Sequence, residues 1–372
     1  MRGVTGAPRH ILMTADAVGG VWGYALDLAR GLAARGVRTT LAVLGPAPDA
    51  AQRAAAAAVP GLALEVTGLP LDWLAGTPAE VEAAGQAVAA RAAALGVDLV
   101  HLNSPALAVA HFGVPVLGAC HSCLATWWEA VRGGPLPADF AWRTALLSRG
   151  YAAADALVAP THAFAEATRR AHALARPPEV VPNGRAGGVP AHADGAFAFT
   201  AGRLWDEGKD LVTLDRAAAR LDAPVLAAGP VRGPNGAAVP LAHLRLLGTL
   251  DDAALRAELA RGPVFVSAAR YEPFGLAVLE AAQAGCALVL SDIPTFRELW
   301  DRAAVFVPPG DDVGFAQAIG GLLRDRERRA ELRVAARERA CRHGPDAMAD
   351  GVHRIHRRLL ARVGPRSGRE AA

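Results

Sequence analysis

The sequence has 372 residues, of which 52% are apolar and 5% aromatic, and its formal net charge is +3. This length suffices for two domains with separate cores, and the composition is that of a folded enzyme rather than of a disordered chain. So small a net charge gives no reason to expect nucleic acid as a partner, and four cysteines do not make a disulfide framework.

The apolar run near the start of the chain is too short for a signal peptide, and no charge-free stretch has the length to span a bilayer. We therefore expect a cytoplasmic protein, with peripheral attachment to the inner face of the membrane as the alternative.

The first half of the chain alternates short apolar runs with alanine-rich stretches. Residues 24–36 form one such stretch, which ends on Gly36, a residue typical of a helix C-cap. Continuous apolar strands with helical crossovers predict a parallel sheet that is covered on both faces. The predicted strands are residues 10–15, 38–45, 98–103, 115–120, 155–160 and 179–184.

Cys120 and Cys123 stand in the sequence CHSC at the end of a predicted strand. One interpretation is a redox pair or half of a zinc site. The other is a pair of small residues at a strand end, which we favour because the sequence offers no second pair of ligands.

The alternation of apolar and alanine-rich runs is interrupted at residues 183–196. This stretch is rich in glycine and proline and indicates a hinge between domains. We predict two doubly wound α/β domains, residues 1–184 and 185–345, with a C-terminal helix at about 346–366 that joins the first. In such sheets ligands bind at the carboxyl ends of the strands. The second set of predicted strands is residues 197–202, 224–230, 244–250, 263–269, 287–292 and 304–309.

The segment AGRLWDEGKD, residues 201–210, contains the only lysine of the chain, against 38 arginines. It lies between a predicted strand and a predicted helix. An arginine binds two phosphate oxygens with its planar guanidinium, whereas a lysine acts as a compact charge. Arg203 and Lys209 are therefore candidates for holding an anionic ligand, with an ordinary surface lysine as the alternative.

The segment YEPFGLAVLEAAQAG begins at residue 271, after another predicted strand. We place Pro273 at an early position of a helix and Glu272 in the loop before it. The backbone N–H groups of Gly275 and Leu276 then lie at a helix N-terminus, which favours a bound anion.

Glu280 lies on the otherwise apolar helix LAVLEAAQAG, with no compensating charge nearby in the sequence. A buried carboxylate needs a partner, and a ribose diol would serve as one. The alternative is that Glu272 and Glu280 are two surface glutamates.

Together these segments resemble the retaining glycosyltransferases of the GT-B fold, family 4 type. AGRL…EGKD resembles the basic donor loop of that family, EPFGLAVLE its E-x7-E motif, and VVPNG the end of its first domain. In the first half, GGVWGYALDLARGLAARG resembles the glycine-rich first loop and helix. PVLGACHS resembles the strand that carries an active-site histidine, here His121. The resemblance implies two Rossmann-like domains that face each other across a cleft.

The resemblance also implies a nucleotide diphosphate sugar, UDP- or GDP-linked, as donor, and neither a metal nor a cofactor. Arg203 and Lys209 would neutralise the diphosphate, Glu272 would hold hydroxyls of the sugar, and His121 would lie beside the sugar. The further donor-binding positions would be Gly20 at the diphosphate, Leu250 at the base, Phe274, Gly275 and Leu276 through their backbone, and Glu280 at the ribose.

We therefore expect a retaining hexosyltransferase whose acceptor is an unidentified sugar, lipid-linked or small molecule. The sequence departs from the family pattern at residues 293–297, where a glycine pair is replaced. The aromatic residues of the first half either stack on the acceptor, fill the core or face a membrane, and these alternatives stay open. They are Trp22, Tyr24, Trp127, Trp128 and Trp142.

Two other functions fit the same two-domain frame. A nucleotide-sugar epimerase or hydrolase would need an acid–base pair, of which we find only His121. A non-catalytic nucleotide-sugar binding protein would bind the donor without turnover.

Overall fold

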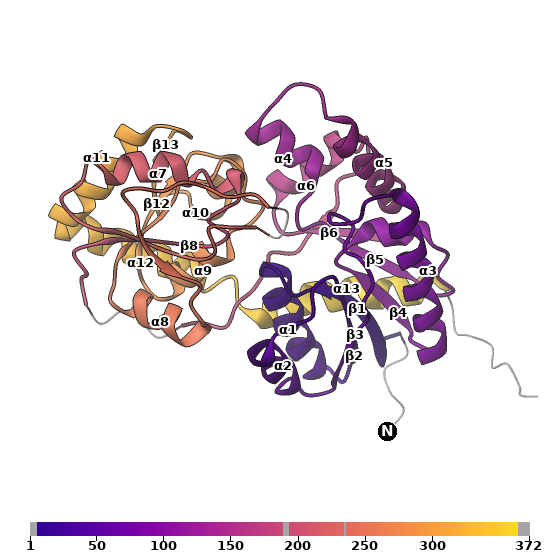
Figure 1. The fold of residues 1–372 in the computed structure, drawn as a ribbon. Coiled ribbons are helices and arrows are strands. Elements are labelled where there is room, and N and C mark those ends of the chain that lie inside the picture. Colours follow the sequence, from indigo (N-terminus) through magenta and orange to yellow (C-terminus); the bar gives the residue numbers. More distant parts are fainter. Residues whose placement is uncertain (1–5, 189–192, 234–235, 364–372) are drawn as a thin grey trace, which may run out of the picture.

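The computed structural model describes residues 6–188, 193–233 and 236–363, and in these residues the chain forms two α/β domains (Figure 1). Each domain has a parallel sheet between two layers of helices. The predicted fold class is therefore confirmed. Among the described residues, no helix combines the length and the apolar character that crossing a bilayer requires.

The first sheet has the strand order β3-β2-β1-β4-β5-β6-β7, with every pair parallel. Its strands are β1 (His10–Asp16), β2 (Arg38–Leu44), β3 (Leu62–Val66), β4 (Leu99–Leu102), β5 (Val116–Ala119), β6 (Ala156–Ala159) and β7 (Glu179–Val180). The helical elements between them are α1 (Gly20–Ala33), α2 (Ala50–Ala57), α3 (Pro78–Leu95), η1 (Pro105–Val109), α4 (Leu124–Val131), α5 (Ala138–Ala153) and α6 (His162–Ala171).

The second sheet has the order β10-β9-β8-β11-β12-β13, again parallel throughout. Its strands are β8 (Ala198–Ala201), β9 (Val225–Ala228), β10 (Arg245–Gly248), β11 (Val264–Ser267), β12 (Ala287–Ser291) and β13 (Val305–Val307). The helical elements are η2 (Glu207–Lys209), α7 (Leu211–Ala218), α8 (Asp252–Ala260), α9 (Leu276–Gln283), α10 (Pro294–Trp300), α11 (Asp312–Arg324) and α12 (Arg326–Ala340).

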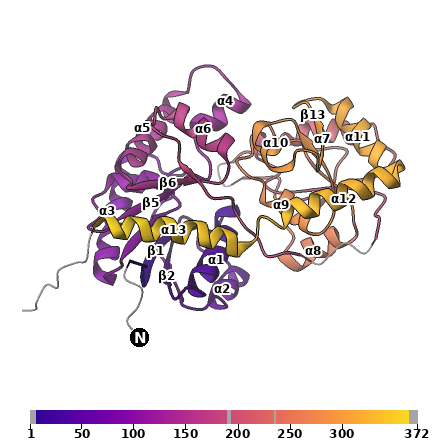
Figure 2. The ribbon, with the colours of Figure 1, turned by 180° about the vertical axis from the view of Figure 1, so that it is seen from behind.

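The last helix, α13 (Pro345–Val363), leaves the second domain and lies along the first (Figure 2). Its apolar residues Met348, Val352 and Leu359 are buried in the same cluster as Ile11 of β1. The closest approach is to α1, where a side chain at Gly31 would meet the Cβ of Ala349 at 2.5 Å. Residues 364–366 of the predicted helix lie outside the described residues.

Neighbouring residues of one strand bury their side chains on opposite faces of the sheet. In β1, Ile11 and Met13 belong to the cluster under α1 and α13, whereas Leu12 belongs to a second cluster with residues of α3. In the second domain the adjacent residues Phe199 and Ala198 likewise belong to two different core clusters. This two-sided burial is why the strands appear in the sequence as unbroken apolar runs.

Three sequence expectations were wrong in detail. The short strand β3 was missed, because none of its residues is fully buried and it is too short to stand out. Helix α1 begins at Gly20, four residues before the predicted start. Helix α9 begins at Leu276, so Pro273 lies in the turn before it and not within the helix.

A buried histidine pair joins α13 to the first sheet. His101 of β4 and His356 of α13 are both fully buried, and Nδ1 of His101 lies 3.3 Å from Nε2 of His356. Burial lowers the pKa of both rings, to about 3 for His356. Both rings are therefore neutral in the folded protein at neutral pH.

We expect acid to destabilise the protein through this pair. Below the ordinary histidine pKa of 6.5 the unfolded chain binds protons that the folded rings do not, so stability falls as the pH falls. The substitution His356→Gln should make the free energy of unfolding less dependent on pH, by about 1.4 kcal/mol per pH unit. Urea unfolding between pH 7 and pH 4 measures it, with His111→Gln, at an exposed position, as control. Equal slopes in the two variants would contradict the assignment.

Candidate functional site

In each sheet the direction in which successive strands are added reverses at one point, and a ligand site is expected there. The order reverses between β1 and β4 in the first sheet and between β8 and β11 in the second. At such a point the loops after adjacent strands diverge and leave a crevice at the carboxyl edge. The predicted site residues Gly20, Arg203 and Glu272 all follow one of these strands.

The loop after β8 carries Arg203 and Lys209. Arg203 donates from a terminal guanidinium nitrogen to Oδ2 of Asp206 at 2.9 Å. Lys209 lies in the single turn η2, and its Nζ donates to Oε2 of Glu272 in the loop after β11. The structure therefore brings the lone lysine and Glu272 together, although 63 residues separate them.

The N-terminus of α9 lies directly after Glu272. Gly275 precedes the helix with φ of +91°, and no side chain caps its first turn. A side chain at this position would be strained and would press on Phe296 at 3.1 Å, so glycine is required. The ring of Phe274 is buried, with its centroid 5.8 Å from that of His343, which leaves only the backbone of Phe274 for a ligand.

The first helix of the other domain also begins at this place. A side chain at Gly20 would meet Cδ1 of Leu276 at 3.2 Å, and one at Gly19 would meet a guanidinium nitrogen of Arg203 at 3.2 Å. The N-termini of α1 and α9 therefore approach each other. Leu250, the predicted base contact, lies partly buried at the edge of the second core.

Glu280 has a partner that the sequence did not reveal. Its Oε1 accepts from Nε of Arg185 at 2.7 Å, and another nitrogen of Arg185 binds Oδ2 of Asp27 in α1 at 3.0 Å. The partner that Glu280 was expected to need is therefore supplied by the chain itself, and no ligand is required for this purpose. Burial raises the pKa of Glu280, and the guanidinium works against that rise. Its contact with a ribose stays a prediction.

His121 follows β5, and hydrogen bonds fix its tautomer. The side-chain nitrogen of Asn103 donates to the carbonyl of Thr14 at 2.7 Å, so the Asn103 oxygen faces the histidine. That oxygen lies 2.7 Å from Nε2, which must carry the proton. Burial lowers the pKa of His121 to about 4. At neutral pH the ring is thus uncharged and Nδ1 is left as an acceptor.

The two halves of the site are joined by contacts that the sequence did not reveal, although it had singled out Trp127 as an aromatic residue. Nε1 of Trp127 in α4 donates to Oδ1 of Asp206, at 3.2 Å, so Asp206 binds both the first domain and Arg203. The hydroxyl of Tyr271 accepts from the backbone N–H of Cys123 at 3.1 Å and lies 2.8 Å from Oγ1 of Thr126. The only available signal was position, because Asp206 and Tyr271 flank predicted site residues.

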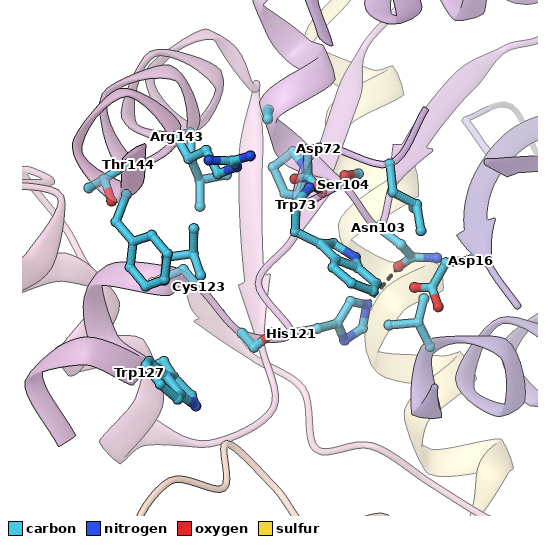
Figure 3. Close-up of a pocket in the computed structure, with 18 of the residues that line it drawn as sticks. Asp16, Asp72, Trp73, Asn103, Ser104, His121, Cys123, Trp127, Arg143 and Thr144 are labelled. Carbon is cyan, nitrogen blue, oxygen red and sulfur yellow. Dashed lines mark hydrogen bonds between the residues drawn. The ribbon is translucent and has the colours of Figure 1, made fainter. Parts of the chain in front are cut away.

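Two hollows meet at Arg203. A small one of about 20 Å³ lies beside Lys209 and Glu272. A large one of about 500 Å³ lies mainly in the first domain, and its lining includes His121 and Asp16. Figure 3 shows His121 hydrogen-bonded to Asn103 beside Asp16, with Trp73 next to them. Arg203 lines both hollows.

Both domains match known glycosyltransferase families. Residues 18–185 match Glycosyltransferase Family 4, and residues 195–325 match Glycosyl transferases group 1. A phosphatidyl-myo-inositol mannosyltransferase of Mycolicibacterium smegmatis is 33% identical over 117 residues, which are 31% of this chain and 30% of the mannosyltransferase. A glycogen synthase of Mycobacterium tuberculosis is 39% identical over 97 residues, 26% of this chain and 23% of the synthase. These matches thus span less than a third of either relative.

Solved structures share the whole architecture. Sucrose-phosphate synthase from Thermosynechococcus elongatus superposes with a TM-score of 0.79 at 18% identity, over 95% of this chain and 100% of that one. HepE of Anabaena, in complex with UDP-glucose, superposes with a TM-score of 0.72 at 18% identity, over 93% and 98% of the two chains. These likenesses confirm the GT-B fold.

The ion pairs of Arg185 give a stability prediction. Replacing Arg185 by methionine leaves the buried Asp27 and the largely buried Glu280 without this guanidinium, and should destabilise the protein by about 3 kcal/mol. Arg30→Met is the matched control, because Arg30 also binds Asp27 but its side chain is half exposed. That variant should lose less than about 1 kcal/mol. Urea unfolding compares them, and equal losses would contradict the role given to Arg185.

Proposed function

We propose that this chain, which joins a Family 4 domain to a group 1 glycosyltransferase domain, is a glycosyltransferase that uses a nucleotide diphosphate sugar. The observation that carries the proposal is the grouping of Lys209, Glu272 and the uncapped N-terminus of α9 beside Arg203. This group supplies cations and N–H donors for a diphosphate, together with a carboxylate for sugar hydroxyls. We expect UDP- or GDP-hexose as the donor.

The charges suit the departure of a diphosphate. As the bond between the anomeric carbon and the phosphate oxygen breaks, its electron pair goes to the diphosphate, which becomes more negative. Arg203 and Lys209 stabilise this charge more in the transition state than in the ground state, and that difference lowers the barrier. These two residues provide the charge that a metal supplies in other transferases, so we propose a metal-independent reaction.

We further propose retention of the anomeric configuration. The acceptor hydroxyl attacks from the face that the diphosphate leaves, its oxygen bonds to the anomeric carbon, and its proton goes to the departing phosphate oxygen. No carboxylate nucleophile is required for this route. His121, uncharged and with Nδ1 as an acceptor, would receive a hydrogen bond from a hydroxyl of the transferred sugar.

The substitution Lys209→Ala tests the assignment of the lysine. We expect kcat to fall by about 10²–10³-fold at saturating donor, because one cation at the leaving group is lost. Arg220→Ala is the control, since Arg220 is a half-exposed arginine that binds Asp312 on the far side of α7. Release of nucleoside diphosphate measures turnover, and thermal unfolding checks the fold. An unchanged kcat in a folded Lys209→Ala variant would refute the role. Lys209→Arg then shows whether charge alone suffices.

Donor and stereochemistry can be tested without any variant. Calorimetric titration with UDP- and GDP-hexoses should find at least one that binds, and the product's anomeric configuration by NMR should match that of the donor. Inversion would refute retention. Donor binding without release of nucleoside diphosphate under any acceptor would favour the non-catalytic alternative, and an epimerised donor without transfer would favour the epimerase.

A further inference from the structure

The large hollow of the first domain has the size of a small-molecule site. Its volume of about 500 Å³ lies within the roughly 300–1,000 Å³ that enclose drug-sized ligands. It reaches from Arg203 and Asp206 of the second domain, past His121, to the side chains of Leu71 and Leu146 in the first. An acceptor in it would thus extend from the proposed donor site into the first domain.

Aromatic and aliphatic side chains form most of the wall. Trp73, Trp127, Phe140 and Trp142 supply flat faces on which a ring can stack. Leu44, Leu71, Leu146 and Leu147 supply aliphatic surface.

Of the aromatic residues singled out in the sequence, three do not line this hollow. The ring of Tyr24 is buried, with its centroid 4.6 Å from that of His121. Trp22 is buried in the core under α1. The indole nitrogen of Trp128 donates to the carbonyl of Gly134 at 3.2 Å.

Two carboxylates in the wall have no basic group bound to them in the described residues, although the positive charge of Arg203 acts on Asp16 and Ser104 forms a hydrogen bond with Asp72. Oδ1 of Asp16, at the end of β1, accepts from the backbone N–H groups of Val18 and Gly19 at 2.9 and 3.2 Å. Oδ1 of Asp72 accepts from the N–H of Trp73 at 2.9 Å. Within residues 6–188, 193–233 and 236–363 neither carboxylate forms an ion pair. Burial raises the pKa of both carboxyl groups, because it disfavours their ionised forms. A ligand that donates hydrogen bonds to them would offset this free-energy cost of burial.

The basic groups of the wall are already engaged. Arg143 forms an ion pair with Asp139, donates to the carbonyl of Ala75 at 2.6 Å and lies 4.3 Å from the ring centroid of Trp142. Arg203 is bound to Asp206 and faces the proposed diphosphate site. Nε of Arg143 has no hydrogen-bond partner among the described residues. In this part of the chain, however, both guanidiniums are already in ion pairs, whereas Asp16 and Asp72 are in none.

We propose that the acceptor is a compact, non-anionic molecule that has an apolar ring body and at least one hydroxyl. The ring body lies against Trp73, Phe140 and Trp142, and donor groups of the molecule bind Asp16 and Asp72. A phosphorylated acceptor is disfavoured, because its charge would face two carboxylates without an unpaired cation. This inference rests on the proposed glycosyl transfer. The acceptor oxygen takes the glycosyl group, and its proton leaves with the diphosphate.

Three naphthols that share one ring skeleton test the charge preference. They are 6-(aminomethyl)-2-naphthol, 6-(hydroxymethyl)-2-naphthol and 6-hydroxy-2-naphthoate, which are cationic, neutral and anionic at pH 7.5. Calorimetric titration should show that the cation and the neutral compound bind and that the anion binds at least about tenfold more weakly. Equal or tighter binding of the anion, or binding of none of the three, would overturn the proposal.

Variants locate the effect in the hollow. Asp72→Asn should reduce the difference in affinity between the anion and the neutral compound. Asp49→Asn, at an exposed helix cap of the same domain, should leave this difference unchanged. Trp142→Leu should weaken the binding of all three compounds. If Asp72→Asn does not fold, the order of affinities of the three naphthols for the unaltered protein still decides whether the proposal holds.

A parallel titration with nucleotide sugars separates the two proposals. Donor binding together with a reversed charge ranking would overturn the acceptor class alone, whereas absence of donor binding would overturn the proposed function.

Discussion

One guanidinium, that of Arg185, fixes the relation between the two helices that meet at the proposed diphosphate site. It binds Asp27 of α1 and Glu280 of α9, while Gly20 and Leu276 at the starts of those helices nearly touch. Both helix N-termini, each a centre of partial positive charge, are thereby directed at one place. Without a cation between them, the two carboxylates would repel each other across the domain boundary. The same residue thus neutralises one buried and one largely buried acid, and it sets the geometry that an anion would use.

A second set of contacts connects the acceptor side to the donor loop. Trp127 in α4 binds Asp206, and Asp206 also holds the guanidinium of Arg203. Tyr271, next to Glu272, reaches back to the backbone of Cys123. The loops that carry the proposed catalytic groups are therefore held from both domains. Any change in the orientation of the domains would alter the position of Arg203 and of Glu272 at once.

The sequence predicted what depends on local pattern. Buried parallel strands appear as unbroken apolar runs, so most strands and the fold class were found, whereas the edge strand β3 is only partly buried and was missed. Lys209 and Glu272 were both placed in loops after strands of one sheet, but the bond between them was not predicted. The partner of Glu280 lies 95 residues away in the hinge, and no local pattern connects it to α9. Long-range ion pairs of this kind were the part that sequence reasoning could not supply.

The charge distribution across the cleft has a chemical consequence. The proposed donor site, with Arg203, Lys209 and the ends of α1 and α9, would favour a negative group. The proposed acceptor hollow, with Asp16 and Asp72, would favour a donor of hydrogen bonds or a positive group. Between them burial keeps His121 neutral, and its bond to Asn103 fixes which ring nitrogen carries the proton. A glycosyl group that becomes positive as its diphosphate becomes negative would thus separate its charge along the existing field. In the proposed reaction a charged imidazolium at His121 would oppose this separation, so the lowered pKa of the ring suits the proposed transfer.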